Sequence, residues 1–362
     1  REVFEEPEIN LPSDWIATLK AVLSHGNVCS KLPIVEQYDT TVQGTNALAP
    51  FGGVNLDAPN DAVVIRPMLD KPYGLIVSHG MNPILNRINP ERGAKWAATE
   101  GVANLVAVGG NFREMVLCGN YISPVPDRQY MGSLDIQVDS ICAFQDALEI
   151  PIVSGKDSLS STYTWPDGKK THVPPVVNIS TMGKIPDIEK TTSTDFKKES
   201  STIVLVGKMH KGMAGSTYYD TLGIVGNEVP DVDLEVLPQV FDAIRNGIVN
   251  GEIKAAHDIS EGGAISAISE MCFGGGMGAE LDIRSEERPD FFLLNETAGT
   301  FIVEVENKEK AEALFGNVPY RVLGKTRAGN SIRVTYQEKH LFSANINDLK
   351  NAWQAPMKAL FH

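Results

Sequence analysis

The chain has 362 residues, of which 42% are hydrophobic and 22% charged, as expected for a globular protein long enough for two domains. Acidic residues (46) outnumber basic ones (32), the formal net charge is −14, and there is no Lys/Arg cluster, which excludes nucleic acid and anionic membranes as preferred partners. No apolar run reaches the roughly 18 residues of a membrane-spanning helix.

The first part of the chain predicts a leader, a helix and two strands. Residues 1–12 are acidic, contain proline and start without Met, which predicts a linker inside a longer protein. An amphipathic helix is expected over 13–24, because its apolar residues recur on one face behind a Ser-Asp cap. A turn-rich segment at 44–53 then leads to strands at 62–66 and 75–78.

A helix over 90–108 follows a predicted loop at 79–90. Glu100 and Asn104 are four residues apart, so they lie on one helical face, and few of their neighbours are charged. One interpretation is a solvated polar stripe. The other is a buried pair of oxygen donors, which requires a cation or hydrogen bonds as partner.

The sequence around 151–160 is the most informative local motif. A helix predicted over 133–148 precedes an apolar run that reads as a buried strand and breaks at Gly155, where the motif turns. Glycine allows a ligand to approach the backbone closely, and Asp157 beside Ser158 offers hard oxygen atoms that suit Mg²⁺ carrying phosphates. The alternative is an ordinary strand end with an Asx turn.

The middle of the chain predicts a hairpin at 163–173 and a strand at 176–185. The polar connector at 186–200 is the predicted domain boundary. Beyond it a strand is expected at 201–206 and a helix at 236–250.

The last part predicts a helix over 264–273 and strands at 291–295 and 299–305. Strands alternate with helices in both halves, so the predicted fold class is α/β or α+β in two domains. The predicted division is a linker and leading helix over 1–30, one domain over 31–186 and a second over 200–362.

The motif His257–Gly263 at a strand–helix junction is a second candidate site. A glycine-rich helix start favours anions, and Asp258 can hold a metal. Alternatively, Asp258 or Ser260 caps the helix while the two glycines allow close packing.

Other enzyme classes lack their motifs. The sequence has no Gly-x-Ser-x-Gly, no His-Glu-x-x-His and no Gly-x-x-x-x-Gly-Lys-Ser/Thr. The four cysteines have no metal-binding spacing, which predicts buried free thiols in a reducing compartment such as the cytoplasm: Cys29, Cys118, Cys142 and Cys272.

Several stretches in the right order match one family: Gln37–Asp39, Asn82–Lys95, Gly155–Ser160, His257–Gly263 and Leu294–Glu296. From about residue 30 onward the chain resembles phosphoribosylformylglycinamidine synthase, a purine-biosynthesis ligase that shares its fold with aminoimidazole ribonucleotide synthetase. The resemblance implies a synthetase portion made of two homologous halves, each with two α/β domains. This chain resembles the second half.

The resemblance also implies ligands. In large family members the second half binds an auxiliary adenine nucleotide, ATP or ADP, with Mg²⁺. The positions that match its metal ligands are Asp61, Glu100, Asn104 and Asp157, and Asn60, Gly155 and Ser158 lie beside the nucleotide. Leu117 and Lys156 stand where the small form carries Asp and Asn, which argues against a direct role of this half in the catalytic ATP site, and its catalytic residues are unknown.

The implied reaction is ATP- and glutamine-dependent conversion of formylglycinamide ribonucleotide to the amidine. The implied partners are the first synthetase half and a glutaminase domain, in the same chain or separate, and the isolated chain is expected to be inactive. One alternative is a stand-alone homodimeric relative that acts on another ATP-dependent substrate. Another is a half that holds its nucleotide permanently as a scaffold and turns nothing over.

Overall fold

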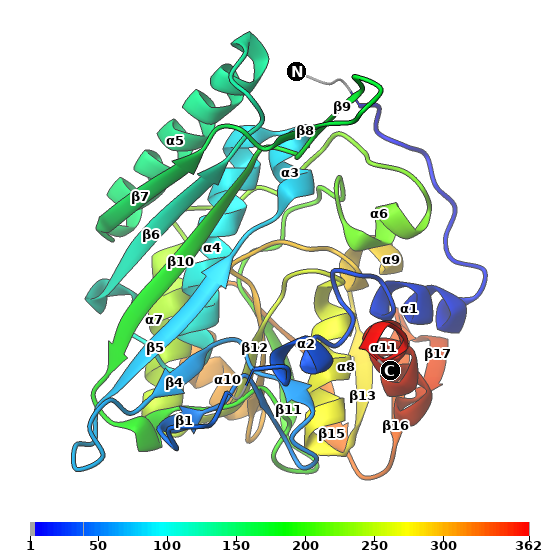
Figure 1. Ribbon diagram of the computed structural model, residues 1–362. Coiled ribbons are helices and arrows are strands. Elements are labelled where there is room, and N and C mark those ends of the chain that lie inside the picture. The colour runs from blue at the N-terminus through cyan, green and yellow to red at the C-terminus, as the bar shows by residue number, and fades with distance from the viewer. Residues whose placement is uncertain (1–3, 39, 362) are drawn as a thin grey trace.

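The computed structural model describes residues 4–38 and 40–361 and has two mixed β-sheets, each covered by helices (Figure 1). The first sheet has the order β1-β4-β5-β10-β6-β7. Its strands are β1 (Asn46–Leu48), β4 (Val63–Ile65), β5 (Gly74–Gly80), β10 (Val176–Ile185), β6 (Met115–Ile122) and β7 (Ile152–Ser158). All neighbours in it are antiparallel except β6 and β7, which run parallel.

The N-terminal part of the chain also forms helices and minor strands, although the first two helices pack against α11 (Ile346–Phe361) and not on this sheet. They are α1 (Trp15–Leu23), α2 (Leu32–Val35), α3 (Pro83–Ile88), α4 (Pro90–Ala107), the 3-10 turn η1 (Phe112–Glu114), α5 (Arg128–Leu148), and the short pairs β2 (Phe51–Gly52) with β3 (Ala58–Pro59) and β8 (Thr162–Thr164) with β9 (Lys170–His172). Helix α4 lies directly on β5 and β10, and α5 packs against α4.

Helix α4 begins where the sequence dictates. Asn89 caps it by accepting a hydrogen bond from the backbone N–H of Arg92, and Pro90 occupies the first turn, where its missing N–H costs nothing. The helix can approach the sheet closely because Gly80 has no side chain. A Cβ atom on Gly80 would lie 2.2 Å from the carbonyl oxygen of Ala97 and 2.5 Å from the backbone nitrogen of Gly101.

Gly80→Ala is therefore expected to destabilise the protein by at least about 1–3 kcal/mol, because backbone rather than a flexible side chain must move. Gly132→Ala is the matched control. A Cβ on this glycine inside α5 meets no atom within 4 Å, so the change should stabilise the helix by about 0.5–1 kcal/mol. Urea unfolding measures both, and equal midpoints for Gly80→Ala and the parent protein would contradict the packing.

The second sheet has the order β12-β14-β11-β15-β13-β16-β17. Its strands are β11 (Thr202–Val206), β12 (Ile253–Asp258), β13 (Gly278–Ile283), β14 (Phe301–Val305), β15 (Tyr320–Arg327), β16 (Ser331–Tyr336) and β17 (Lys339–Asn345). The helices of this half are η2 (Ile188–Lys190), α6 (Thr217–Thr221), α7 (Leu237–Val249), α8 (Gly263–Gly275), α9 (Pro289–Leu293), α10 (Lys308–Phe315) and α11 (Ile346–Phe361).

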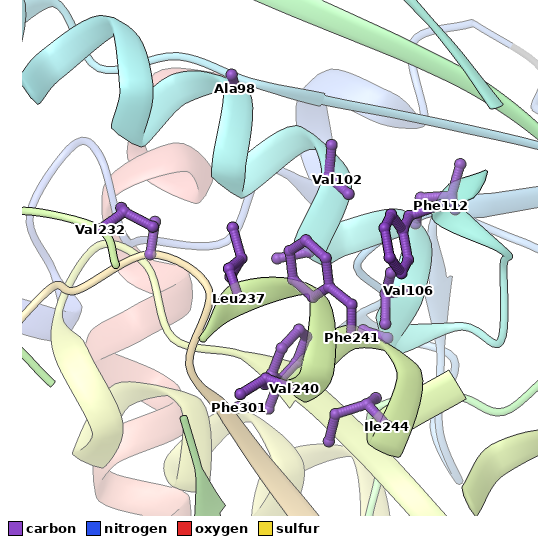
Figure 2. Close-up of a cluster of buried hydrophobic side chains, with 14 of the residues drawn as sticks. Ala98, Val102, Val106, Phe112, Val232, Leu237, Val240, Phe241, Ile244 and Phe301 are labelled. Atoms are coloured by element: carbon purple, nitrogen blue, oxygen red, sulfur yellow. The ribbon is translucent and has the colours of Figure 1, made fainter. Parts of the chain in front are cut away.

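One hydrophobic core joins the two halves. Figure 2 shows Val102 of α4 facing the side chains of α7, with Phe241 in the middle of the cluster. The ring of Phe241 meets Phe112 edge-on at 5.5 Å and Phe301 of β14 at 6.1 Å. Because these fully buried contacts join elements of both halves, the two halves form one packed unit.

The face of the first sheet that points away from α4 is largely open. Gly183 faces α4, so its neighbour Met182 points to the opposite side, where 52% of its surface is exposed. His79, Ser180 and Cys118 are adjacent in the register of β5, β10 and β6 and are also exposed. We call this surface the open face: His79, Cys118, Ser180 and Met182.

The predicted fold class is confirmed, but four local predictions are wrong. The stretch 291–295 is not a strand: residues 291–293 form the end of helix α9, because Pro289 starts a helical turn. The predicted loop at 79–90 contains α3, which Asn82 caps. The strand around Gly155 is neither buried nor broken there: β7 continues to Ser158 and is mostly exposed because it is an edge strand.

The fourth error concerns the thiols. All four cysteines are free, but only Cys29 and Cys272 are buried, whereas Cys118 and Cys142 are exposed. Among the described residues, no helix is both long and apolar enough to cross a membrane.

Candidate metal and nucleotide site

Acidic side chains from both halves meet where α4 approaches β12. Asp61, in the loop between β3 and β4, accepts a hydrogen bond from the backbone N–H of Asp258 at the end of β12 (2.9 Å). Its other oxygen lies 2.6 Å from Nδ1 of His257. The side chain of Asp61 is 1% exposed, so this contact is sealed from water.

His257 is held from two sides. Its Nε2 lies 2.9 Å from a carboxylate oxygen of Glu270 on α8, opposite the contact with Asp61. Burial alone lowers the pKa of the imidazole, but the charges and hydrogen bonds of Asp61 and Glu270 outweigh it and raise that pKa well above its usual range. The ring is therefore a buried cation between carboxylates.

Asp258 has a carboxylate oxygen that no protein group in the described part of the chain contacts by a hydrogen bond. Its Oδ2 is buried and has no hydrogen-bond partner among the described residues. Burial, followed by the charge of Asp61, raises the pKa of the Asp258 carboxyl well above its usual range. One atom each of Asp61, His257 and Asp258 lie within 4.8 Å of one another, a spacing that suits a single metal ion.

Further carboxylates surround Asp61 and Asp258, and electrostatic interactions link all of them into one group. We define the acidic cluster as Asp61, Glu100, Asp258, Glu261, Glu270 and Glu296. Glu100 accepts a hydrogen bond from the backbone N–H of Met81 at 2.8 Å, and its pKa is raised by burial and by the charges of Glu261 and Asp258. Carboxylate oxygens at this density, with few cations, fit a divalent cation such as Mg²⁺.

The stability of the metal-free protein should fall as the pH rises from about 4.5 to 8. Burial raises the pKa of Glu261 to about 7 and, with the charge of Glu261, that of Glu296 to about 8, from 4.5 in both cases. A raised pKa means that the folded state binds the proton more tightly than the unfolded state. The stabilisation that these protons give is therefore complete below pH 4.5 and is lost as the pH passes the folded pKa values.

Glu296→Gln should flatten this decline, because Gln keeps the acceptor for the backbone N–H groups of Thr217 and Gly262 and carries no charge. We expect the free energy of unfolding of the parent protein to drop by at least about 1 kcal/mol over this window in EDTA. Glu309→Gln, at an exposed position on α10, is the control and should leave the slope unchanged. A slope that Glu296→Gln does not alter would contradict the prediction.

Of the four predicted metal ligands, Asp61 and Glu100 lie in the acidic cluster. Asn104 lies one turn further along α4, and its amide nitrogen donates to the carbonyl oxygen of His79 (3.1 Å). Asp157 is exposed on β7, which lies three strand spacings, or about 14 Å, from β5. Asp157 takes part in none of the interactions that link the acidic cluster. The four-residue ligand set stays a prediction.

The residues predicted beside the nucleotide occupy two places. Asn60 links two loops by hydrogen bonds. Its Nδ2 donates to the carbonyl oxygen of Ala49, and its Oδ1 accepts from the backbone N–H of Thr194. Gly155 and Ser158 lie on β7, where Lys156 donates a hydrogen bond to the Ser158 hydroxyl. A Cβ atom on Gly155 would meet no atom within 4 Å, so protein packing does not require a glycine there.

The cluster contains three acids to which the sequence alone gave no role: Glu261, Glu270 and Glu296. Glu261 and Glu296 lie inside matched motifs, and Glu270 is an acid in an otherwise apolar helix. The proposed caps are wrong, since α8 starts after Gly262, which has positive φ, and neither Asp258 nor Ser260 caps it.

The prediction of close packing at the start of α8 is confirmed. A Cβ on Gly263 would lie 2.6 Å from the backbone of Leu294, and its φ of +73° is also unfavourable for other residues.

Two family profiles match the chain. The "FGAR-AT PurM_N-like domain" matches residues 30–184, and the "AIR synthase related protein, C-terminal domain" matches residues 198–337. The phosphoribosylformylglycinamidine synthase subunit PurL of Deinococcus radiodurans is 31% identical over 97% of this chain and 47% of its own length. PurL of Picrophilus torridus is 30% identical over 98% of this chain and 45% of its own length.

Solved structures agree in fold. Thermotoga maritima PurL complexed with FGAR has a TM-score of 0.73 at 16% identity, covering 94% of this chain and 54% of that one. The same protein complexed with ATP has a TM-score of 0.63 at 16% identity, covering 94% and 55%. A structure of PurLQS from this organism has a TM-score of 0.68 at 16% identity, covering 95% of this chain and 52% of that one.

The two sheets, the joint core and the two profiles define a two-domain protein of the AIR synthase-related class. Within this class the chain belongs to the phosphoribosylformylglycinamidine synthase family. It spans about half the length of the curated PurL relatives that it matches.

Proposed function

We propose that this chain is one half, the second, of a phosphoribosylformylglycinamidine synthase synthetase unit and that it binds an adenine nucleotide with a divalent cation. The observation that carries the proposal is the buried acidic cluster, in which the Asp258 Oδ2 has no partner. Support also comes from PurL relatives over the whole chain and from a matching PurL complexed with ATP. The full enzyme would convert formylglycinamide ribonucleotide to the amidine with ATP and glutamine.

The side chains of the cluster have defined roles in this proposal. Asp61, Glu100 and Asp258 would hold the cation, while Asp157 and Asn104 would lie on the nucleotide side. A bound Mg²⁺ would neutralise phosphate charge. Gly155 would leave room for phosphates, since its Cβ position faces open space. Glu270 orients His257, which fixes Asp61 for its contact with Asp258.

The partner in this proposal is the half that the chain does not contain. PurL relatives are about twice as long as this chain, so a region of similar size is available as the occupant of the open face. Met182 places an apolar side chain at the centre of that face. The family resemblance implies a glutaminase partner, and the fold matches that of a chain in a structure of PurLQS.

A scaffold role is favoured by one observation. His257 lies 2.6 Å from Asp61 and 2.9 Å from Glu270, so a protein cation already compensates part of the acidic charge. In that case the half would hold its nucleotide without turnover. Tightly bound ADP that does not exchange with labelled ATP distinguishes the scaffold from a functional site.

The test is the binding of ADP and ATP to the purified chain with and without Mg²⁺, by calorimetry and by native mass spectrometry. We expect Mg²⁺-dependent binding that Gly155→Ala weakens at least about tenfold, while leaving unfolding unchanged because the new methyl group meets no protein atom. Gly26→Ala, whose Cβ would also meet no atom within 4 Å, is the matched control for binding. Nucleotide binding that is absent, or indifferent to Mg²⁺, would refute the proposed site.

A further inference from the structure

A cavity lies apart from the acidic cluster, between α3, the first turns of α5 and the segment after β9. Its volume is about 810 Å³, within the range of small-molecule sites. Apolar walls come from residues such as Ile136 and Pro174, and polar groups come from three elements. The polar lining residues that matter are Asn86, Arg87, Arg128, Tyr130, Ser133 and His172.

The charge of this cavity is opposite to that of the chain. Arg87 and Arg128 line it, and none of the described lining residues is acidic, although the net charge of the protein is −14. Arg128 is exposed and takes part in no ion pair among the described residues. The nearest carboxylate in sequence, Asp127, is occupied as the cap of α5, where it accepts from the backbone N–H of Tyr130.

The aromatic wall is ordered. The rings of Tyr130 and His172 lie 5.6 Å apart, and Nδ1 of His172 lies 3.0 Å from the hydroxyl of Thr162. When that hydroxyl donates to Nδ1, the imidazole proton is on Nε2, which can donate to a ligand. Guanidinium, imidazole N–H and phenol groups together are donors that suit a phosphate.

A buried acceptor provides an independent observation. Asn86 lines the cavity, is only 1% exposed, and its Oδ1 has no hydrogen-bond partner among the described residues. Its Nδ2 is already used, because it donates to the carbonyl oxygen of Asn82 (2.9 Å). An unpaired buried acceptor is costly, so a ligand hydroxyl or N–H that donates to it would be recognised.

The cavity is connected to the acidic cluster through α3. Asn82 caps this helix, and its Nδ2 lies 3.3 Å from Glu261 of the cluster. Since α3 has six residues, the two sites are separated by roughly 9 Å of helix. They are neighbours without sharing a side chain.

We propose that this cavity binds a phosphorylated, hydroxyl-bearing small molecule of the sugar-phosphate or nucleoside monophosphate class. Arg128 and His172 contact the phosphate, and Asn86 accepts a hydrogen bond from a hydroxyl of the ligand. The inference does not depend on the proposed synthase role, because no residue of the acidic cluster lines the cavity.

The test is calorimetric titration of the full chain with ribose 5-phosphate, inorganic phosphate and ribose, at low ionic strength in EDTA so that metal-dependent binding is removed. We expect ribose 5-phosphate to bind more tightly than phosphate and ribose to bind least. Arg128→Gln should weaken ribose 5-phosphate at least about tenfold, and Arg128→Lys should recover part of that loss. Arg333→Gln, an exposed arginine on β16, should have no effect.

Three results overturn the proposal: no binding of ribose 5-phosphate at millimolar concentration, equal affinity in Arg128→Gln and the parent chain, or an equal loss in Arg333→Gln. The first two exclude the site, and the third shows a general charge effect. Circular dichroism verifies that Arg128→Gln remains folded, and Tyr130→Ala gives a second, uncharged alteration of the same wall. Because the titration contains no metal, it can fail while Mg²⁺-nucleotide binding succeeds, and the reverse.

Discussion

Asp258→Asn is expected to abolish Mg²⁺-nucleotide binding while making the metal-free protein more stable. The change removes a ligand charge but keeps the shape of the side chain. Loss of groups that only orient a metal ligand typically costs 10–100-fold in affinity, so loss of the ligand carboxylate itself should cost at least about 100-fold. Calorimetry with Mg²⁺-ADP measures the first effect.

The gain in stability follows from the surroundings of Asp258. Burial and the charge of Asp61 raise its pKa, so the folded state opposes its ionisation, and its Oδ2 has no hydrogen-bond partner. Whether the carboxyl is ionised or protonated at neutral pH, the unfolded chain releases the proton more readily, and this difference disfavours folding. Asparagine has no such cost, so unfolding in EDTA should require about 1–2 kcal/mol more.

Asp61→Ala is the matched variant and should act in the opposite direction. Asp61 is paired with the buried imidazole of His257 and accepts from the backbone N–H of Asp258, so its removal leaves a cation and a donor without partners. Breaking such a buried pair costs about 3–5 kcal/mol. If Asp258→Asn instead destabilised the metal-free protein and left nucleotide affinity unchanged, the carboxylate would be structural.

Only part of this site could be predicted from the sequence. The carboxylates Asp61 and Glu100 could be proposed as ligands from the family resemblance and, for Glu100, also from its position in a mostly apolar helix. Their convergence with Asp258 could not, because these positions are brought together by the packing of α4 against β12, between residues about 160 to 200 apart. His257 as the cation between Asp61 and Glu270 is a product of the same tertiary contact.

The fold shows the same division. Helix α4 could be predicted with its start and end because caps and periodicity lie within the segment. The short apolar run at 291–295 fits either a strand or a helix, and Pro289 together with tertiary packing decides for a helix. Strand β7 has apolar residues typical of a buried strand, and only the sheet order shows that it lies at an edge.

The isolated chain is expected to form no amidine from formylglycinamide ribonucleotide, ATP and ammonia, and to gain activity when the missing half is added as a separate protein. The physical reason is that this chain spans about half of its PurL relatives and keeps the open face of its first sheet uncovered. Ammonia replaces glutamine as donor so that a glutaminase is not needed. Product formation is measured by mass spectrometry. Clear turnover by the chain alone would refute the prediction that it needs the other half for activity.

Met182→Lys tests whether the open face carries this association. A lysine at the centre of the sheet would place an unpaired charge inside the new interface, which costs about 3 kcal/mol and therefore weakens association at least about 100-fold. The chain itself should stay folded, because Met182 is already 52% exposed. Leu222→Lys is the control, since this leucine is 49% exposed beyond α6 and lies outside the open face. If both variants bound the missing half as tightly as the parent chain, the halves would meet on another surface.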